Sequence, residues 1–186
     1  MINVENPEYT IIEYHDQIEL RDYDNFIVAQ VMVKENFKTA RSIGFKFLAH
    51  YISGDNIGHL KIAMTAPVMQ QKQENAWNIS FVMPGLYSFD ELPKPFNNKI
   101  KLLEIPQKIF VVIRFSGLTS DSNIARNLAK LKDFISEHNF KPLSQEIYAF
   151  YNPPWTLPFL RRNEIMVEIQ PQVHDFNQNM SILEDE

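Results

Sequence analysis

The 186-residue sequence contains no cysteine. Disulfide bonds, thiolate metal sites, iron–sulfur clusters and cysteine nucleophiles are therefore excluded. No apolar run approaches the roughly 20 residues that a membrane-spanning helix needs, and the first residues lack the basic and apolar stretches of a secretory signal. We therefore expect a soluble protein of the cytoplasm, because a cysteine-free composition fits a reducing compartment.

The motifs of common enzyme classes are also missing. There is no phosphate-binding glycine loop, no Gly-x-Ser-x-Gly turn and no His-Glu-x-x-His pair. The five histidines are scattered, and none lies three or four residues from another, so a helical pair of metal ligands is absent. We expect no catalytic residues and no protein-held metal site.

The charged residues are unevenly distributed. Eighteen lysines and arginines against 23 acidic residues give a net charge of −5. Four acidic residues and no basic ones lie in 172–186, which leaves 18 basic and 19 acidic side chains in 1–171. A nearly neutral body lacks the basic face that phosphate backbones require, so we expect no nucleic-acid partner. Residues 172–186 are expected to form a flexible acidic tail that adds little stability.

Apolar periodicity divides the remaining chain into two similar halves around a proline-rich connector at 93–98. In the first half we expect strands within 9–33, a helix over 36–52, and strands over 60–65 and 77–83. In the second half we expect strands over 100–105 and 108–115, a helix over 120–138 capped by Ser120 or Asp121, and strands over 146–151 and 164–169.

With the strands before each helix counted as one region, each half reads β-α-β-β, which indicates a duplicated unit in a single α+β domain over 1–171. This order disfavours a doubly wound parallel sheet, in which strands and helices would alternate throughout. Two helices packed on a largely antiparallel sheet or barrel fit better. We expect the pseudo-repeats 9–83 and 100–170 to be related by a pseudo-twofold rotation.

A proline-rich stretch near the end of the body concentrates unusual residues. Three prolines stiffen the loop, and Trp155 and Phe159 cannot both be buried easily at a hairpin tip. These aromatics could form the wall of a site for a flat apolar ligand, or they could cover the end of the sheet. Arg161 and Arg162 could pair with Glu164 or with a ligand carboxylate.

Several segments together resemble the SOUL heme-binding protein family. The two most specific are KIAMTAPV at 61–68 and NPPWTLPFLRRNE at 152–164. Shorter segments match in the same order: YTII at 9–12, IELRDY at 18–23, ISFVMP at 79–84 and RFSG at 114–117. The resemblance covers about 7–170, and a chance match of so many ordered motifs is improbable.

The resemblance implies two β-α-β-β repeats that form a distorted antiparallel β-barrel with two flanking helices. It also implies noncovalent binding of heme or another tetrapyrrole, for carriage, buffering or sensing, in a cleft beside the first helix and under the proline-rich loop. In some family members, basic side chains of that helix and loop lie near the porphyrin propionates.

The candidate ligand-binding residues are Arg41, Phe45, Ala49, His50, Trp155 and Phe159. The first three recur every fourth residue, beside the apolar face by which the first helix would pack on the core. A cation and an aromatic ring would therefore lie together. His50 lies on the opposite flank, where it is either an iron ligand or an exposed histidine at the helix end.

Two other classes of function stay open at this stage. One is a module of the same fold that binds an apolar ligand or a protein without heme, because one fold hosts many functions. The other is an enzyme acting in the same cleft. Its conceivable acid–base groups are Glu146, Glu164 and His50.

Overall fold

The computed structural model describes residues 4–171. The expected tail at 172–186 lies outside the described residues. The elements are β1 (Tyr9–His15), β2 (Ile18–Tyr23), β3 (Phe26–Val33), α1 (Phe37–Ile52), β4 (Val68–Gln73), β5 (Ala76–Val82), η1 (Phe89–Glu91), β6 (Ile100–Ile105), β7 (Lys108–Phe115), α2 (Asp121–Glu137), β8 (Ile147–Phe150), η2 (Pro158–Leu160) and β9 (Asn163–Glu168).

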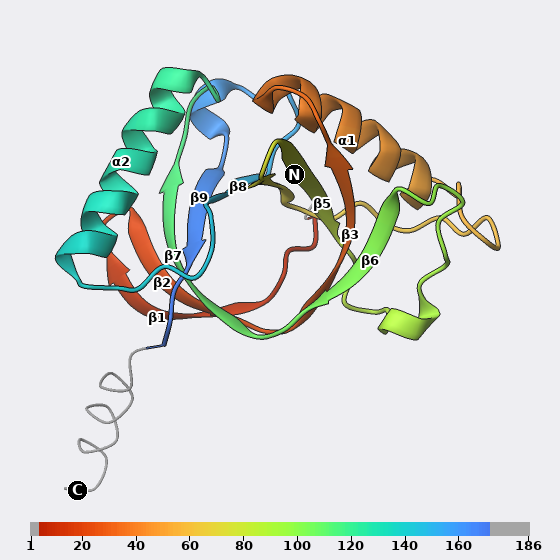
Figure 1. Ribbon diagram of the computed structural model, residues 1–186, viewed down its shortest axis with the longest axis horizontal. Helices are drawn as coiled ribbons and strands as arrows, with labels where there is room; N and C mark the ends of the chain where they lie inside the picture. The colour runs from red at the N-terminus through yellow and green to blue at the C-terminus, as the bar shows by residue number, and fades with distance from the viewer. Residues whose placement is uncertain (1–3, 172–186) are drawn as a thin grey trace, which may run out of the picture.

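The nine strands form one antiparallel sheet in the order β1-β2-β7-β9-β8-β4-β5-β3-β6. The sheet curls into a half-barrel with β1 and β6 at its two edges, and the helices lie on its outer face (Figure 1). The predicted α+β class, with an antiparallel curled sheet and two flanking helices, is confirmed. Neither helix of the described part combines the length and apolar composition that crossing a membrane requires.

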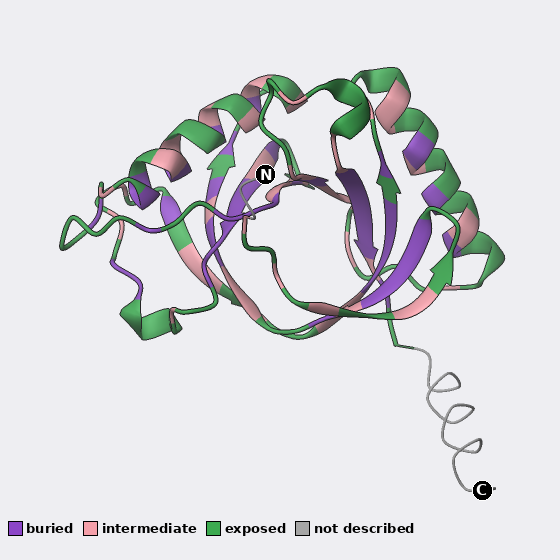
Figure 2. Ribbon diagram, turned by 180° about the vertical axis from the view of Figure 1, so that it is seen from behind, coloured by how far each residue is buried: buried purple, intermediate pink, exposed green. Residues whose placement is uncertain are grey.

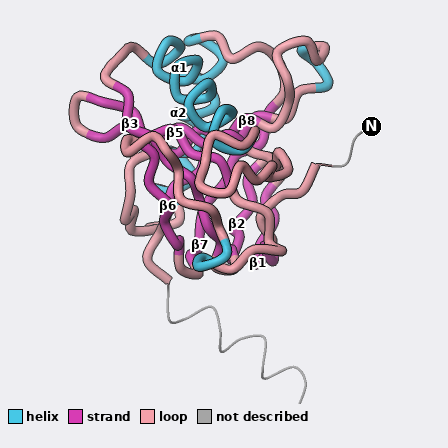
Figure 3. Tube along the Cα trace, turned by 90° about the vertical axis from the view of Figure 1, so that its right-hand side faces the viewer, coloured by secondary structure: helices cyan, strands magenta, loops and turns pink. Residues whose placement is uncertain are grey.

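Both faces of the sheet contribute to the core. On the outer face, α1 packs on β3 and β5 around Leu48 and Ile79, and α2 packs on β7 and β9 around Leu131 and Ile165. On the inner face a third cluster forms around Tyr23, Phe110, Val112, Ala149 and Met166. Figure 2 shows that the buried parts of the strands lie mainly beneath the two helices, whereas the strand parts farthest from the helices are mostly intermediate or exposed. In the side view of Figure 3, both helices gather at one end of the molecule above the strands.

The helix boundaries follow from their caps. The Asn36 side chain accepts a hydrogen bond from the Thr39 amide at 3.0 Å, and the Ser120 hydroxyl accepts one from the Asn123 amide at 3.3 Å. These bonds satisfy amides that have no partner inside the helix. The predicted helices over 36–52 and 120–138 are confirmed to within a residue at each end, and Ser120 is the N-cap.

Helix α1 lies unusually close to the sheet at Gly44. A Cβ atom built there would lie 2.4 Å from Cγ1 of Ile79 on β5, and 2.5 Å from its Cβ. Only a residue without a side chain permits this approach. Gly44 and Ile79 therefore set the distance between α1 and the sheet.

The predicted strand over 60–65 is wrong. This segment is an irregular connection. Leu60 exchanges two hydrogen bonds with the Asn56 side chain, the Ile62 amide donates to the Ile52 carbonyl (2.8 Å), and the Thr65 hydroxyl donates to the Val82 carbonyl (2.6 Å). The strand is β4, which begins directly after Pro67 and pairs with β5 and β8. Met64, within this segment, is 41% exposed.

The strand order is the one that two duplicated halves would produce. From the centre outward it reads β8-β9-β7-β2 on one side, with β1 added at the edge, and β4-β5-β3-β6 on the other. Inside the edge strand β1, one pairing on each side joins the two halves, since β2 pairs with β7 and β6 pairs with β3. Duplication about a pseudo-twofold axis stays a prediction, and this order supports it.

Candidate functional site

The proline-rich loop at 151–162 connects β8 to β9 and lies between the N-terminal ends of α1 and α2 (Figure 1). The Gly117 amide donates to the Pro158 carbonyl at 2.9 Å, which fixes the loop to the segment before α2. A hydrogen bond from Arg41 to Thr119 (3.5 Å) and an ion pair between Lys38 and Asp121 (3.6 Å) join the two helix ends. Loop and helix ends therefore form one continuous surface.

A buried ionic cluster clamps the base of this loop. The Glu164 carboxylate accepts two hydrogen bonds from Arg21 (both 3.0 Å), one from the Tyr151 hydroxyl (2.8 Å) and one from Nε of Arg162 (2.9 Å). Arg21 also donates to Tyr23 and, at 2.5 Å, to Glu19. The Arg21 and Glu164 side chains are fully buried. The paired charges explain how both groups are tolerated in the interior.

The cluster shifts the pKa values of its members. Burial alone would raise the pKa of Glu164, but the hydrogen bonds and charge of Arg21, together with the charge of Arg162, hold it below its usual range. For Tyr23, burial raises the pKa to about 12, while the Arg21 charge opposes the shift. Glu164 is therefore a permanent anion at neutral pH, with each oxygen already engaged.

The lowered pKa of Glu164 predicts an acid-side loss of stability. A carboxyl group whose pKa is lower folded than unfolded stabilises the fold above its unfolded pKa of about 4.3. That stability is lost as the pH falls through the folded-state value. We expect the free energy of unfolding, measured by urea denaturation, to fall more steeply below about pH 4.3 in the wild type than in Glu164→Gln. Parallel pH profiles for the two proteins would contradict this assignment.

Two arginines lie where the loop faces α1, Arg41 on the helix and Arg161 on the loop. Burial, and then the nearby positive charge of Arg161, lower the pKa of Arg41. The Arg41 guanidinium stacks over the Phe150 ring at 4.1 Å. Arg161 donates to the carbonyls of Pro154 and, at 2.8 Å, Thr156. Within residues 4–171 neither arginine forms an ion pair with a carboxylate, so the two positive charges lie together without compensation.

Large apolar side chains project from the same loop into solvent. Trp155 is 82% exposed and Phe159 is 70% exposed, and Leu157 and Leu160 are also exposed. Phe159 and Leu160 belong to η2. Exposed side chains of this size in one short segment are typical of a ligand or partner surface. The structure thus places these aromatics in solvent and not over the end of the sheet.

The other predicted site residues are distributed along α1. Phe45 is 42% exposed, and its ring meets that of Phe81 edge-on with 5.3 Å between centroids. Ala49 is half-buried and His50 is exposed in the last turn. His50 lies nine residues beyond Arg41, about 13 Å along the helix axis. The structure therefore associates Arg41 with the loop and places His50 towards the other end of α1.

The two carboxylates named for an enzymatic alternative are already bonded to other side chains. Glu146 forms a 2.6 Å ion pair with Lys132, and Glu164 is saturated by its arginine and tyrosine partners. Arg162 pairs with Glu164, which answers one question that the sequence left open. Sequence reasoning missed the burial of Arg21. In the sequence, Arg21 stands at a polar position of an alternating strand, and such positions ordinarily face solvent, so nothing there indicates burial.

Three comparisons with known proteins are informative. The family model described as SOUL heme-binding protein matches residues 4–168. Human heme-binding protein 2 is 29% identical over 139 residues, which span 70% of this chain and 66% of that protein, just under two thirds of its length.

Solved structures share the fold at low identity. The EcmrR C-terminal domain superposes with a TM-score of 0.63 at 13% identity, covering 84% of this chain and 98% of that one. A hydrolase from Listeria innocua gives a TM-score of 0.58 at 9% identity, covering 85% and 94%. At such identities the likeness establishes the architecture and nothing about activity.

Proposed function

We propose that this chain, which belongs to the SOUL heme-binding protein family, binds heme or a related tetrapyrrole noncovalently between α1 and the proline-rich loop. The observation that carries the proposal is the uncompensated pair Arg41 and Arg161 beside the exposed rings of Trp155 and Phe159. A tetrapyrrole with propionates is complementary to both features: its flat apolar body matches the rings, and its anionic edge matches the arginines.

The physical roles divide accordingly. Trp155 and Phe159 would cover porphyrin area that otherwise faces water, at about 25 cal/mol per Å². Arg41 and Arg161 would attract the propionates, which remove their mutual repulsion. Phe45 and Ala49 would extend the apolar wall along α1. The bound group would supply its iron and its visible absorption, and the residues of this chain would hold and orient it.

The test is a visible absorption titration with hemin. We expect a saturable Soret shift at one equivalent. Trp155→Ala should weaken binding by about 1–3 kcal/mol, because a large aromatic contact is lost. Arg41→Ala should weaken it by only about 0–1 kcal/mol, since a propionate at a cleft mouth stays hydrated and screened.

Matched variants make the titration specific. Phe96→Ala removes an aromatic ring that is 53% exposed in the connector, away from the loop, and should leave hemin affinity unchanged. His50→Ala should leave the Soret position unchanged, because we expect His50 to be a bystander; a shifted band would make it an iron ligand. Unchanged affinity in both Trp155→Ala and Phe45→Ala would refute the site.

The exposed loop also supports a second candidate, an apolar-ligand or protein-interaction module without heme. Only slow, non-stoichiometric broadening of the hemin spectrum would favour it. In either case we propose a ligand-binding protein and not an enzyme, supported by the engaged carboxylates of Glu146 and Glu164. We propose the cytoplasm as its compartment, on the cysteine-free composition.

A further inference from the structure

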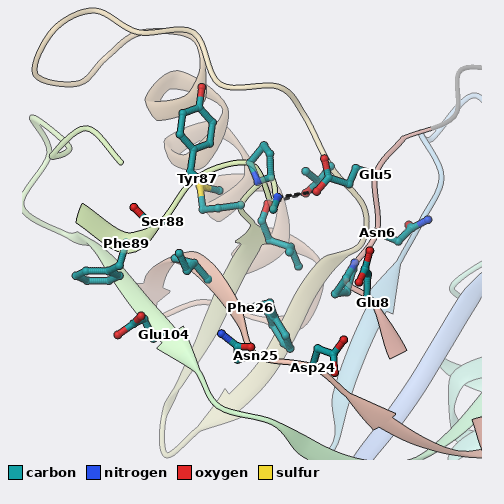
Figure 4. A pocket seen from close by; sticks show the side chains of 17 residues that line it. Glu5, Asn6, Glu8, Asp24, Asn25, Phe26, Tyr87, Ser88, Phe89 and Glu104 are labelled. Atoms are coloured by element: carbon teal, nitrogen blue, oxygen red, sulfur yellow. Dashed lines mark hydrogen bonds between the residues drawn. The ribbon is translucent and has the colours of Figure 1, made fainter. Parts of the chain in front are cut away.

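A cavity of about 670 Å³ lies apart from α1 and the proline-rich loop, neither of which contributes to its lining. Its walls are the segment at 5–8, the β2–β3 turn, the ends of β5 and β6, and the connection at 83–89 (Figure 4). Its volume is in the range of small-molecule sites. It therefore offers a binding volume separate from the proposed tetrapyrrole surface.

Hydrogen bonds hold the N-terminal segment in place as one wall. A carboxylate oxygen of Glu5 accepts from the Gly85 amide at 2.6 Å, the bond drawn in Figure 4. The Glu5 carbonyl accepts from the Ala66 amide at 2.8 Å, and the Glu8 carbonyl accepts from the Asp24 amide at 3.2 Å. The cavity is thus built by backbone contacts and not only by side chains that can rotate away.

The lining carries charge of one sign. Glu5, Glu8, Asp24 and Glu104 contribute four carboxylates, and no lysine, arginine or histidine of the described chain lines the cavity. None of the four forms an ion pair within residues 4–171. Residues 1–171 hold nearly equal numbers of acidic and basic side chains, so this excess is local to the cavity. Its field attracts cations and repels the propionates of a tetrapyrrole.

The geometry argues for an organic cation and not a metal ion. Across residues 4–171, no three acidic or histidine side chains are close enough together to hold a metal. In Figure 4 the labelled carboxylates instead surround the opening from different walls, with Phe26, Tyr87 and Phe89 among them. Aromatic rings bind organic cations through their faces and also cover an apolar body.

We infer that this cavity binds an organic cation with an apolar or aromatic body, the carboxylates neutralising its charge and the rings contacting its apolar part. This site is additional to the proposed function and does not depend on it. A metal ion and a small hydrated polyamine lack the apolar body that the rings would contact, and an aromatic anion lacks the positive charge that the carboxylates would neutralise.

The experiment uses the full chain and ethidium, a fluorescent aromatic cation, with 1-anilinonaphthalene-8-sulfonate as an aromatic anion. We expect saturable one-to-one ethidium binding that is weakened at least about fivefold in Glu8→Gln/Asp24→Asn, since two of four attracting charges are removed. The control Glu137→Gln/Asp133→Asn removes the same charges from exposed positions of α2 and should leave ethidium affinity within about twofold. Thermal melting establishes that both variants fold.

Further variants and competitors in the same assay locate the site and identify its ligand class. Phe89→Ala should weaken ethidium binding, whereas Trp155→Ala should not, because Trp155 belongs to the other surface. Millimolar Mg²⁺ should compete no better than NaCl of equal ionic strength. Equal weakening in both charge-neutralised variants, tighter binding of the anion, or loss of ethidium binding in Trp155→Ala would each overturn the proposal.

Discussion

Arg21→Met is expected to lower the free energy of unfolding by about 3–5 kcal/mol, measured by urea denaturation at pH 7. The substitution keeps much of the side-chain volume but removes two hydrogen bonds and the opposing charge from Glu164. Glu164 would keep Arg162 and Tyr151 as partners, yet its carboxylate would be undercompensated in a site that water does not reach. Removing one member of a buried pair is far more destabilising than the pair is stabilising.

The matched control is Lys108→Met. Lys108 pairs with Glu168 at 2.6 Å, but both side chains remain partly exposed, so the loss should be at most about 1 kcal/mol. The double variant Arg21→Met/Glu164→Gln should lose less than the sum of its single variants, because the stranded charge is gone. Similar losses for Arg21→Met and Lys108→Met would show that burial of the cluster is not what makes it sensitive.

Gly44→Ala is expected to destabilise the protein by about 1–3 kcal/mol, although alanine is the better helix former by about 1 kcal/mol. The new methyl group would lie 2.4–2.9 Å from three side-chain atoms of Ile79. The branched Ile79 side chain is completely buried and has no room to rotate away. Helix α1 would have to move off the sheet and lose packing around Leu48.

The control lies two residues away on the same helix. Ser42 is exposed, so Ser42→Ala should be neutral or slightly stabilising through helix propensity alone. Chemical denaturation gives the free energy of unfolding of both variants, and so separates the cost of the packing clash from the gain in helix propensity. A Gly44→Ala protein as stable as the Ser42→Ala protein would mean that α1 shifts without loss.

Periodicity predicted most of the elements because most of them have one apolar face. It failed at β4, whose sequence VMQQKQ is mostly polar. That strand is held by pairing with a neighbour on each side, and Gln70 is buried with its amide bonded to the Phe37 carbonyl. No alternation of apolar residues marks such a strand, so the apolar segment before it was chosen instead.

Part of the candidate site was predictable and part was not. The spacing of prolines around Trp155 and Phe159 predicts a stiff loop and leaves two roles open for the rings, and the structure places both rings in solvent. The positive charge of Arg161 acts on Arg41 across 120 positions of the sequence, and Arg21 bonds to Glu164 across 143. Contacts of this kind depend on how the sheet curls, which a single sequence does not specify.

The crossed strands at the flanks of the sheet have a consequence for synthesis. Strand β2 pairs with β7, about 90 residues later in the chain, and β3 waits in the same way for β6. Pairings between distant segments are slow to form, and strands that wait for partners are prone to aggregate. During translation the first half therefore leaves the ribosome with unpaired edges on both flanks. Those edges stay available to other chains until β6 and β7 have been synthesised.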